Sequence, residues 1–186
     1  MAAKNTARTG FTVPGLSLED GRKIATILQG RLHSLNDLQL TLKHAHWNVV
    51  GRDFIGVHKM LDPQILLVRA MIDEVAERIA TLGTAPNGLP GALVKERDWD
   101  DYSLGRAQTA QHLAALDLVY NGVISSHREA IEKTGELDPV TQDMLITQCA
   151  QLELFQWFMR AHLEDPSGVL ETAGAETEKT AARKTR

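Results

Sequence analysis

The chain is poor in the features that mark secreted, membrane-embedded and β-sheet proteins. Its single cysteine, Cys149, excludes an intrachain disulfide bond. Neither a signal-type apolar segment nor a run of about 20 apolar residues occurs, so we expect a cytoplasmic protein that does not enter a membrane. No internal repeat and no strand-like alternation of apolar and polar residues is visible. With 186 residues, of which 43% are hydrophobic, the chain is long enough for one domain with a well-buried core.

An excess of positive charge is also absent. The 20 Lys and Arg residues are outnumbered by 24 Asp and Glu residues, and the formal net charge of −4 gives the molecule no overall attraction for nucleic acid. The cations that could contact DNA phosphates lie near the two ends of the chain: Lys4, Arg8, Lys179, Arg183, Lys184 and Arg186. The acidic stretch 165–178 precedes the second group. These cations have two equally good explanations. They belong either to a solubilising tail or to a site of weak, sequence-independent DNA binding.

Apolar residues that recur every three or four positions predict four long helices. The first begins at the capping signal Ser17-Leu18-Glu19-Asp20 and ends before Gly51. The second spans about 54–82 and the third about 104–134. The fourth opens at Asp138 and Pro139, a residue pair typical of a helix cap followed by its first turn.

The long connection 84–102, between the second and third helices, sets the predicted topology. It contains two prolines and two glycines within 86–91, with one short helical turn expected near 92–96. A connection of this length is typical of a crossover in a four-helix bundle. We therefore predict an all-α four-helix bundle over residues 16–165, with a flexible N-terminal arm, 1–15, and a flexible C-terminal tail, 166–186.

The second helix carries two pairs of metal-ligand residues, His58 with Asp62 and Asp73 with Glu77, each spaced by four residues. The pairs share a sector of about 100°, but His58 and Asp73 lie roughly 22 Å apart along the axis. An antiparallel second copy of the helix, related by a two-fold axis near 66–69, would bring the two pairs together at two identical sites. From spacing alone, ordinary charge on an amphipathic helix explains these residues at least as well.

Three stretches together resemble the Dps family, the ferritin-like mini-cages of bacteria. Residues 45–51 read AHWNVVG, residues 54–62 read FIGVHKMLD, and residues 73–78 read DEVAER. The resemblance extends from about Leu16 to Glu164. It adds His46, near the end of the first helix, as a further ligand. A turn of the chain at Gly51 would bring His46 to the site.

The resemblance implies a ferritin-like subunit in a hollow dodecamer built from two-fold dimers. The expected activity is oxidation of Fe(II), with hydrogen peroxide favoured over oxygen, followed by storage of ferric mineral and protection of DNA. Iron, with two ions per site, is expected between His46, His58 and Asp62 of one subunit and Asp73 and Glu77 of its partner. The chain has no Glu-x-x-His motif, from which other ferritin-like bundles build a site within one subunit. Iron itself is implied by the family, because such mixed ligands also suit Mn(II), Co(II) or Zn(II).

Further residues have both a functional and a structural interpretation. Trp47, beside the site, either packs in the core or donates an electron when oxidant exceeds Fe(II), and Trp157 is expected in the core or at an interface. Asp143 matches an acidic position of the family's three-fold pores, although helix-end charge also explains it. Four further histidines are interpreted as surface or structural residues: His33, His112, His127 and His162.

Two alternative functions remain open from the sequence. A divalent metal at the same inter-subunit site could activate water for hydrolysis, with Asp73 or Glu77 as the base. No substrate pocket or oxyanion hole is evident in the sequence. Alternatively, the protein chiefly compacts DNA through its tails, which would associate it with the nucleoid.

Overall fold

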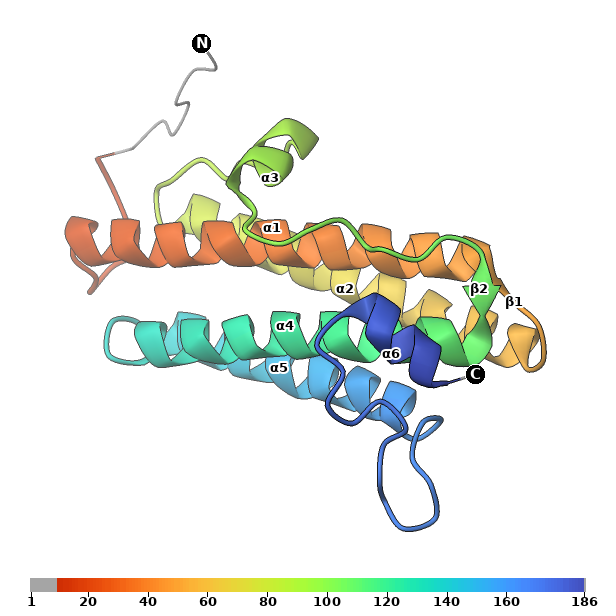
Figure 1. The fold of residues 1–186 in the computed structure, drawn as a ribbon. Coiled ribbons are helices and arrows are strands. Elements are labelled where there is room, and N and C mark those ends of the chain that lie inside the picture. The colour runs from red at the N-terminus through yellow and green to blue at the C-terminus, as the bar shows by residue number, and fades with distance from the viewer. Residues whose placement is uncertain (1–9, 186) are drawn as a thin grey trace.

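The computed structural model describes residues 10–185, and within them four long helices form a bundle (Figure 1). These helices are α1 (Leu18–Asn48), α2 (Phe54–Thr81), α4 (Thr109–Gly135) and α5 (Pro139–Arg160). The pairs α1 with α2 and α4 with α5 each form an antiparallel hairpin. The predicted all-α four-helix bundle is confirmed. None of the helices described is long and apolar enough to cross a membrane.

The core lies along the axis of the bundle and is built from the apolar stripes of all four helices. Burial of these stripes supplies most of the driving force for folding, because it removes apolar surface from water. The following core side chains are at most 1% exposed: Ile24, Leu28, Leu35, Leu38, Leu42, Leu61, Val68, Val75, Ile79, Leu116, Tyr120, Leu145 and Leu152.

Side-chain caps fix the starts of two of the helices. Ser17 Oγ accepts a hydrogen bond from the Asp20 amide at 3.0 Å, and Asp138 accepts from the Val140 amide at 3.3 Å. Both caps were predicted. The helix expected from about residue 104 instead begins at Thr109, because Gln108 is extended and forms a capping box with Gln111. The residues before Thr109 belong to the crossover.

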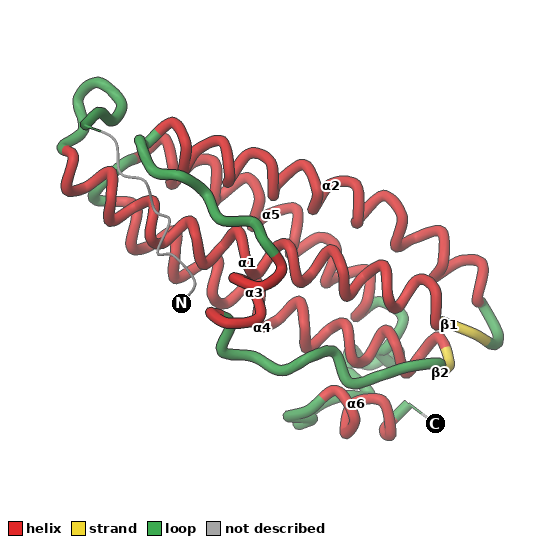
Figure 2. Tube along the Cα trace, turned by 90° about the horizontal axis from the view of Figure 1, so that it is seen from above, coloured by secondary structure: helices red, strands yellow, loops and turns green. Residues whose placement is uncertain are grey.

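The crossover between α2 and α4 runs lengthwise over the bundle and contains the short helix α3 (Pro90–Glu96) (Figure 2). Side chains of α1 hold it, among them Gln29 and Asp37. The Gln29 amide donates to the Asn87 carbonyl at 2.9 Å, and Asp37 accepts from Trp99 Nε1 at 2.7 Å. The crossover ends in β2 (Ala107–Gln108), which pairs in parallel with β1 (Val49–Val50) at the end of α1.

The C-terminal segment differs from the flexible tail expected over 166–186. It contains the short helix α6 (Glu178–Lys184), which packs on α4 and buries Ala181 and Ala182 (Figure 1). The Ser103 amide donates to Glu178 at 2.6 Å, which ties α6 to the crossover. Alanines give a weak hydrophobic pattern, but two of them are sufficient for close packing against a long helix. The arm residues 1–9 and Arg186 lie outside the described residues.

Candidate metal centre

His46 and His58 face each other across the α1–α2 hairpin. Their rings stack with centroids 3.6 Å apart and an interplanar angle of 23°. Nδ1 of His46 lies 3.0 Å from the His58 carbonyl oxygen, and Nδ1 of His58 lies 3.0 Å from the His46 carbonyl oxygen. A carbonyl can only accept, so each Nδ1 must carry the proton and donate it. An imidazole that carries its proton on Nδ1 can offer the lone pair of Nε2 to a metal ion.

Asp62 completes a group of three ligand residues with the histidines. One possible ligand atom from each residue lies within 4.8 Å of the other two. The Lys43 ammonium donates to Asp62 Oδ1 at 3.0 Å, and this hydrogen bond is the main reason why the pKa of Asp62 is lowered. The carboxylate is therefore ionised and able to bind a cation. A bound ion would share Asp62 with Lys43.

The α1–α2 turn holds this group in place. Gly51 adopts φ +95°, and a Cβ atom there would lie 1.9 Å from Gln108 Oε1, so only glycine fits. The backbone of Asp53, just before α2, also adopts the left-handed conformation, with φ +62°. These two residues reverse the chain tightly enough for α2 to return along α1. The β1–β2 pairing then fixes the turn against the crossover.

Asp73 and Glu77 do not join the group within one subunit. Both are exposed on α2, one helical turn apart, and Asp73 lies roughly 16 Å beyond Asp62 along the helix axis. Among residues 10–185, the group of His46, His58 and Asp62 is the one set of three such side chains whose donor atoms converge. The structure thus contains three of the five predicted ligands together, and places the other two on the open surface of the same helix.

The other candidate residues occupy varied environments. Trp47 is 71% exposed and Trp157 is 58% exposed, so neither packs in the core of its own subunit. Core packing was one of the two interpretations given for each residue. Asp143 is exposed near the start of α5. Lys179 and Arg183 are exposed on α6, whereas Lys184 donates to the Ala173 carbonyl.

Among the histidines expected to be structural, three are buried. His33 lies 3.0 Å from the Asn87 carbonyl in the crossover, and His112 and His127 are fully buried on α4. His162 is exposed, and its Nδ1 lies 2.7 Å from the Phe158 carbonyl oxygen. The residue that sequence reasoning missed is Lys43. It lies three residues before His46, one helical turn away on the same face, and that spacing was the available signal.

Comparison with known proteins agrees with this architecture. Residues 25–169 match the model of the ferritin-like domain. The chain is 60% identical over 178 residues to the DNA protection during starvation protein of Mycolicibacterium smegmatis, covering 96% of this chain and 97% of that protein. A solved structure of Mycobacterium smegmatis Dps superposes with a TM-score of 0.89 at 59% identity, covering 91% of this chain and 97% of the other. DpsA14 from Streptomyces coelicolor gives a TM-score of 0.86 at 57% identity, covering 88% and 97%. The chain therefore belongs to the Dps family of ferritin-like proteins.

Proposed function

We propose that this protein oxidises Fe(II) with hydrogen peroxide at sites shared by two subunits and stores the ferric product inside a dodecameric cage. The observation that carries the proposal is the arrangement of His46, His58 and Asp62. Two imidazoles held through Nδ1 and one ionised carboxylate form a half-site for a divalent transition metal.

The second half of the site is supplied by a partner subunit. Asp73 and Glu77 are exposed on α2, as ligands for a neighbouring copy must be. Leu66 and Leu67, between the two ligand sets, are 66% and 43% exposed. A pair of exposed leucines is costly on a free subunit and favours burial against a second copy of α2 about a two-fold axis.

The chemistry follows from this ligand set. Hydrogen peroxide takes two electrons and two protons and becomes two water molecules. Two Fe(II) ions supply one electron each and become Fe(III). The carboxylates of Asp62, Asp73 and Glu77 stabilise the higher charge, while the histidines hold the ferrous ions before reaction. Oxidation by this route consumes both iron and peroxide, which would protect DNA from damage.

Further assembly is supported by a second apolar surface. Ile146, Leu154 and Trp157 follow one another on α5 at spacings of eight and three residues, and all are at least 42% exposed. This stripe begins beside the exposed Asp143. In a closed cage, burial of the stripe against other subunits would place Asp143 near an opening, where repeated carboxylates concentrate cations.

The activity is tested by adding Fe(II) anaerobically and then hydrogen peroxide, while Fe(III) formation is followed by absorbance. The native protein is expected to oxidise the iron rapidly, and a His46→Ala, Asp73→Ala double variant is expected to lose at least about 100-fold in rate, because each half-site loses a ligand. His162→Ala, which removes an exposed histidine elsewhere, serves as the matched control. Equal rates in the native protein and the double variant would refute the site.

The cage is tested separately by native mass spectrometry. We expect a mass near twelve times 20.5 kDa. A stable monomer would remove the inter-subunit site and the storage cavity together.

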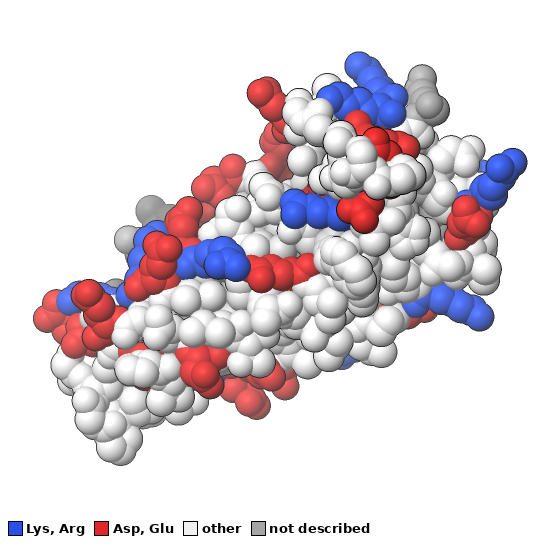
Figure 3. Space-filling model, turned by 90° about the horizontal axis from the view of Figure 1, so that it is seen from below, with Lys and Arg blue, Asp and Glu red and all other residues white. Residues whose placement is uncertain are grey.

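Direct DNA binding is a further part of the proposal, supported by the names of the relatives and by the exposed cations of α6. On the face drawn in Figure 3, basic side chains alternate with acidic ones and do not form one continuous patch. Binding should therefore be weak, independent of base sequence and strongly reduced by salt. Charge reversal of Lys179 and Arg183 is expected to abolish a gel shift at low salt, with iron oxidation unchanged. If the shift persists, the N-terminal arm or the shell surface must bind the DNA.

A further inference from the structure

A hydrogen-bonded tyrosine–histidine pair lies beside the end of α1 and has no part in the mechanism described above. Tyr102, in the crossover, places its hydroxyl 3.0 Å from Nδ1 of His112, on α4. The two rings are nearly parallel, with centroids 6.0 Å apart and an interplanar angle of 17°. His112 is fully buried. A direct hydrogen bond between a phenol and an imidazole is the arrangement in which a proton can move as an electron leaves the phenol.

The surroundings of His112 determine the direction of this hydrogen bond. Burial lowers the pKa of His112, so the imidazole is neutral, although the nearby backbone carbonyls of Asn48 and Gly105 oppose the shift. The phenol of Tyr102 occupies Nδ1 of His112. The carbonyl acceptors therefore favour the tautomer of His112 that carries its proton on Nε2. Nε2 makes no hydrogen bond of good geometry. Burial also raises the pKa of Tyr102 well above its ordinary value, so the group is a phenol that donates to Nδ1.

The pair contacts the end of α1 on both sides of a metal ligand. The ring of His44 lies edge-on to the Tyr102 ring, with centroids 6.0 Å apart. The Asn48 carbonyl lies against His112. His44 and Asn48 stand two residues before and two residues after His46, so the backbone of one helical turn connects the pair to this ligand.

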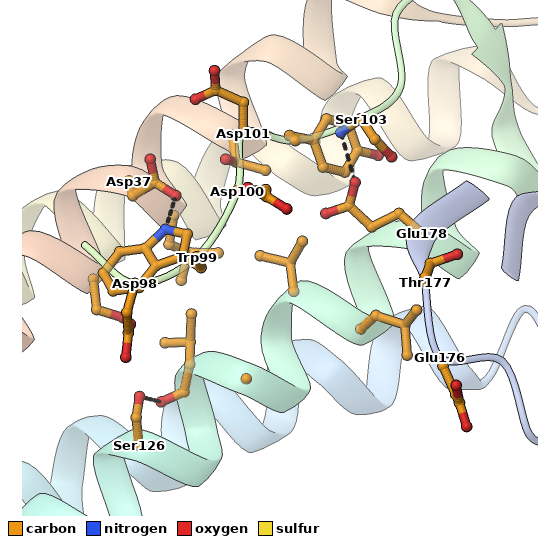
Figure 4. A pocket seen from close by; sticks show the side chains of 18 of the residues that line it. Asp37, Asp98, Trp99, Asp100, Asp101, Ser103, Ser126, Glu176, Thr177 and Glu178 are labelled. Atoms are coloured by element: carbon orange, nitrogen blue, oxygen red, sulfur yellow. Dashed lines mark hydrogen bonds between the residues drawn. The ribbon is translucent and has the colours of Figure 1, made fainter. Parts of the chain in front are cut away.

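The other side of Tyr102 borders a cavity of about 760 Å³ between α1, α4, the crossover and α6. Figure 4 shows this cavity with the neighbouring residues Trp99 and Ser103, and with several carboxylates around its wall. Tyr102 therefore lines this cavity and also contacts His44 on α1.

We propose that Tyr102 is a one-electron donor to the metal centre, and that His112 accepts its proton. The inference rests on the proposed ferroxidase function. It applies when a site holds one Fe(II) and meets hydrogen peroxide, which needs two electrons. Fe(II) gives one electron and Tyr102 gives the other. The phenol proton passes to Nδ1 of His112, the peroxide takes two protons from solvent, and the products are Fe(III), two water molecules, a neutral tyrosyl radical and a protonated His112. Without the second donor, the same reaction would release a hydroxyl radical.

The chain contains a matched control in Tyr120, its one other tyrosine. Tyr120 is fully buried, and its hydroxyl donates to Gln64 Oε1 at 2.7 Å. An amide oxygen is a much weaker base than an imidazole nitrogen, so Tyr120 has no comparable proton acceptor. The two tyrosines therefore differ in the feature on which the proposal depends.

The test uses the assembled protein with one Fe(II) per site, mixed with excess hydrogen peroxide and frozen for electron paramagnetic resonance. Ring-deuterated tyrosine identifies a tyrosyl signal against any tryptophan radical from Trp47. The native protein and Tyr120→Phe are expected to give the tyrosyl signal, and Tyr102→Phe is expected to lose it. A spin trap should detect more hydroxyl radical from Tyr102→Phe than from the other two proteins.

Fe(III) formation is measured in the same samples, which separates the two proposals. If iron is oxidised but the native protein gives no tyrosyl signal, or Tyr102→Phe keeps it, the role of Tyr102 is overturned while the ferroxidase function stands. If the native protein does not oxidise iron, both proposals fail. Loss of the signal in Tyr102→Phe alone, with Fe(III) formation retained, supports the inference.

Discussion

Mixing His46→Ala subunits with Asp73→Ala subunits is expected to restore about a quarter of the native ferroxidase sites, although neither variant is active alone. Each site takes His46 from one subunit and Asp73 from its two-fold partner. In a mixed dimer, one site loses both residues and the other site is intact. Random pairing makes half of the dimers mixed, so one site in four recovers.

The measurement requires subunits that exchange before they assemble. Two differently tagged variants are produced together, and cages that carry both tags are purified and assayed with Fe(II) and hydrogen peroxide. A mixture of His46→Ala and His58→Ala subunits is the control, because both changes affect the same half-site and no pairing restores it. Activity in that control, or no recovery in the His46 and Asp73 mixture, would contradict a site shared by two subunits.

Lowering the pH from 7 to 5 is expected to reduce the free energy of unfolding by about 2 kcal/mol per subunit through His127 alone. Burial lowers the pKa of His127 from 6.5 to about 4, and the nearby Arg31 charge adds to the effect. Between these two pKa values the unfolded chain binds more protons than the folded chain, so stability falls as the pH falls. The full contribution, reached below about pH 4, is about 3 kcal/mol.

His127→Leu is expected to remove this dependence. The variant also replaces a buried ring whose nitrogens make no hydrogen bond of good geometry with a side chain that needs none, so a gain in stability at pH 7 is expected too. Denaturation is compared at both pH values at one protein concentration, because assembly also contributes to stability. Carboxylates titrate in the same range, so the informative quantity is the difference between the native protein and the variant. His162→Leu should behave like the native protein, and an unchanged pH dependence in His127→Leu would disprove the assignment.

The main helices were predictable because they depend on local signals. Ser17 and the pair Asp138 and Pro139 mark helix starts through capping, and leucines and isoleucines at helical spacing mark the faces that pack together. The helix α6 was not predicted, because Ala181 and Ala182 are too small to produce a hydrophobic pattern. Its position depends on contacts with α4, which lie far away in the sequence.

The candidate site was predictable as a set of residues but not as a geometry. The family resemblance points to His46, His58 and Asp62, yet the sequence does not reveal that the two imidazoles hold each other through backbone carbonyls. The sequence also does not reveal that Lys43 donates a hydrogen bond to Asp62. Exposed tryptophans such as Trp157 present a related difficulty, since an aromatic residue at helical spacing looks the same whether it faces its own core or another subunit.

The reciprocal hydrogen bonds between His46 and His58 join residues only 12 positions apart. Closing so short a loop costs little chain entropy, so the half-site can form together with the α1–α2 hairpin and before any subunit meets another. A newly folded subunit would then be able to hold one metal ion, while the acids needed to stabilise the oxidised product arrive only with a partner. Under the proposed function, association of subunits acts as the switch that turns metal capture into metal oxidation, and free subunits are spared the reactive chemistry.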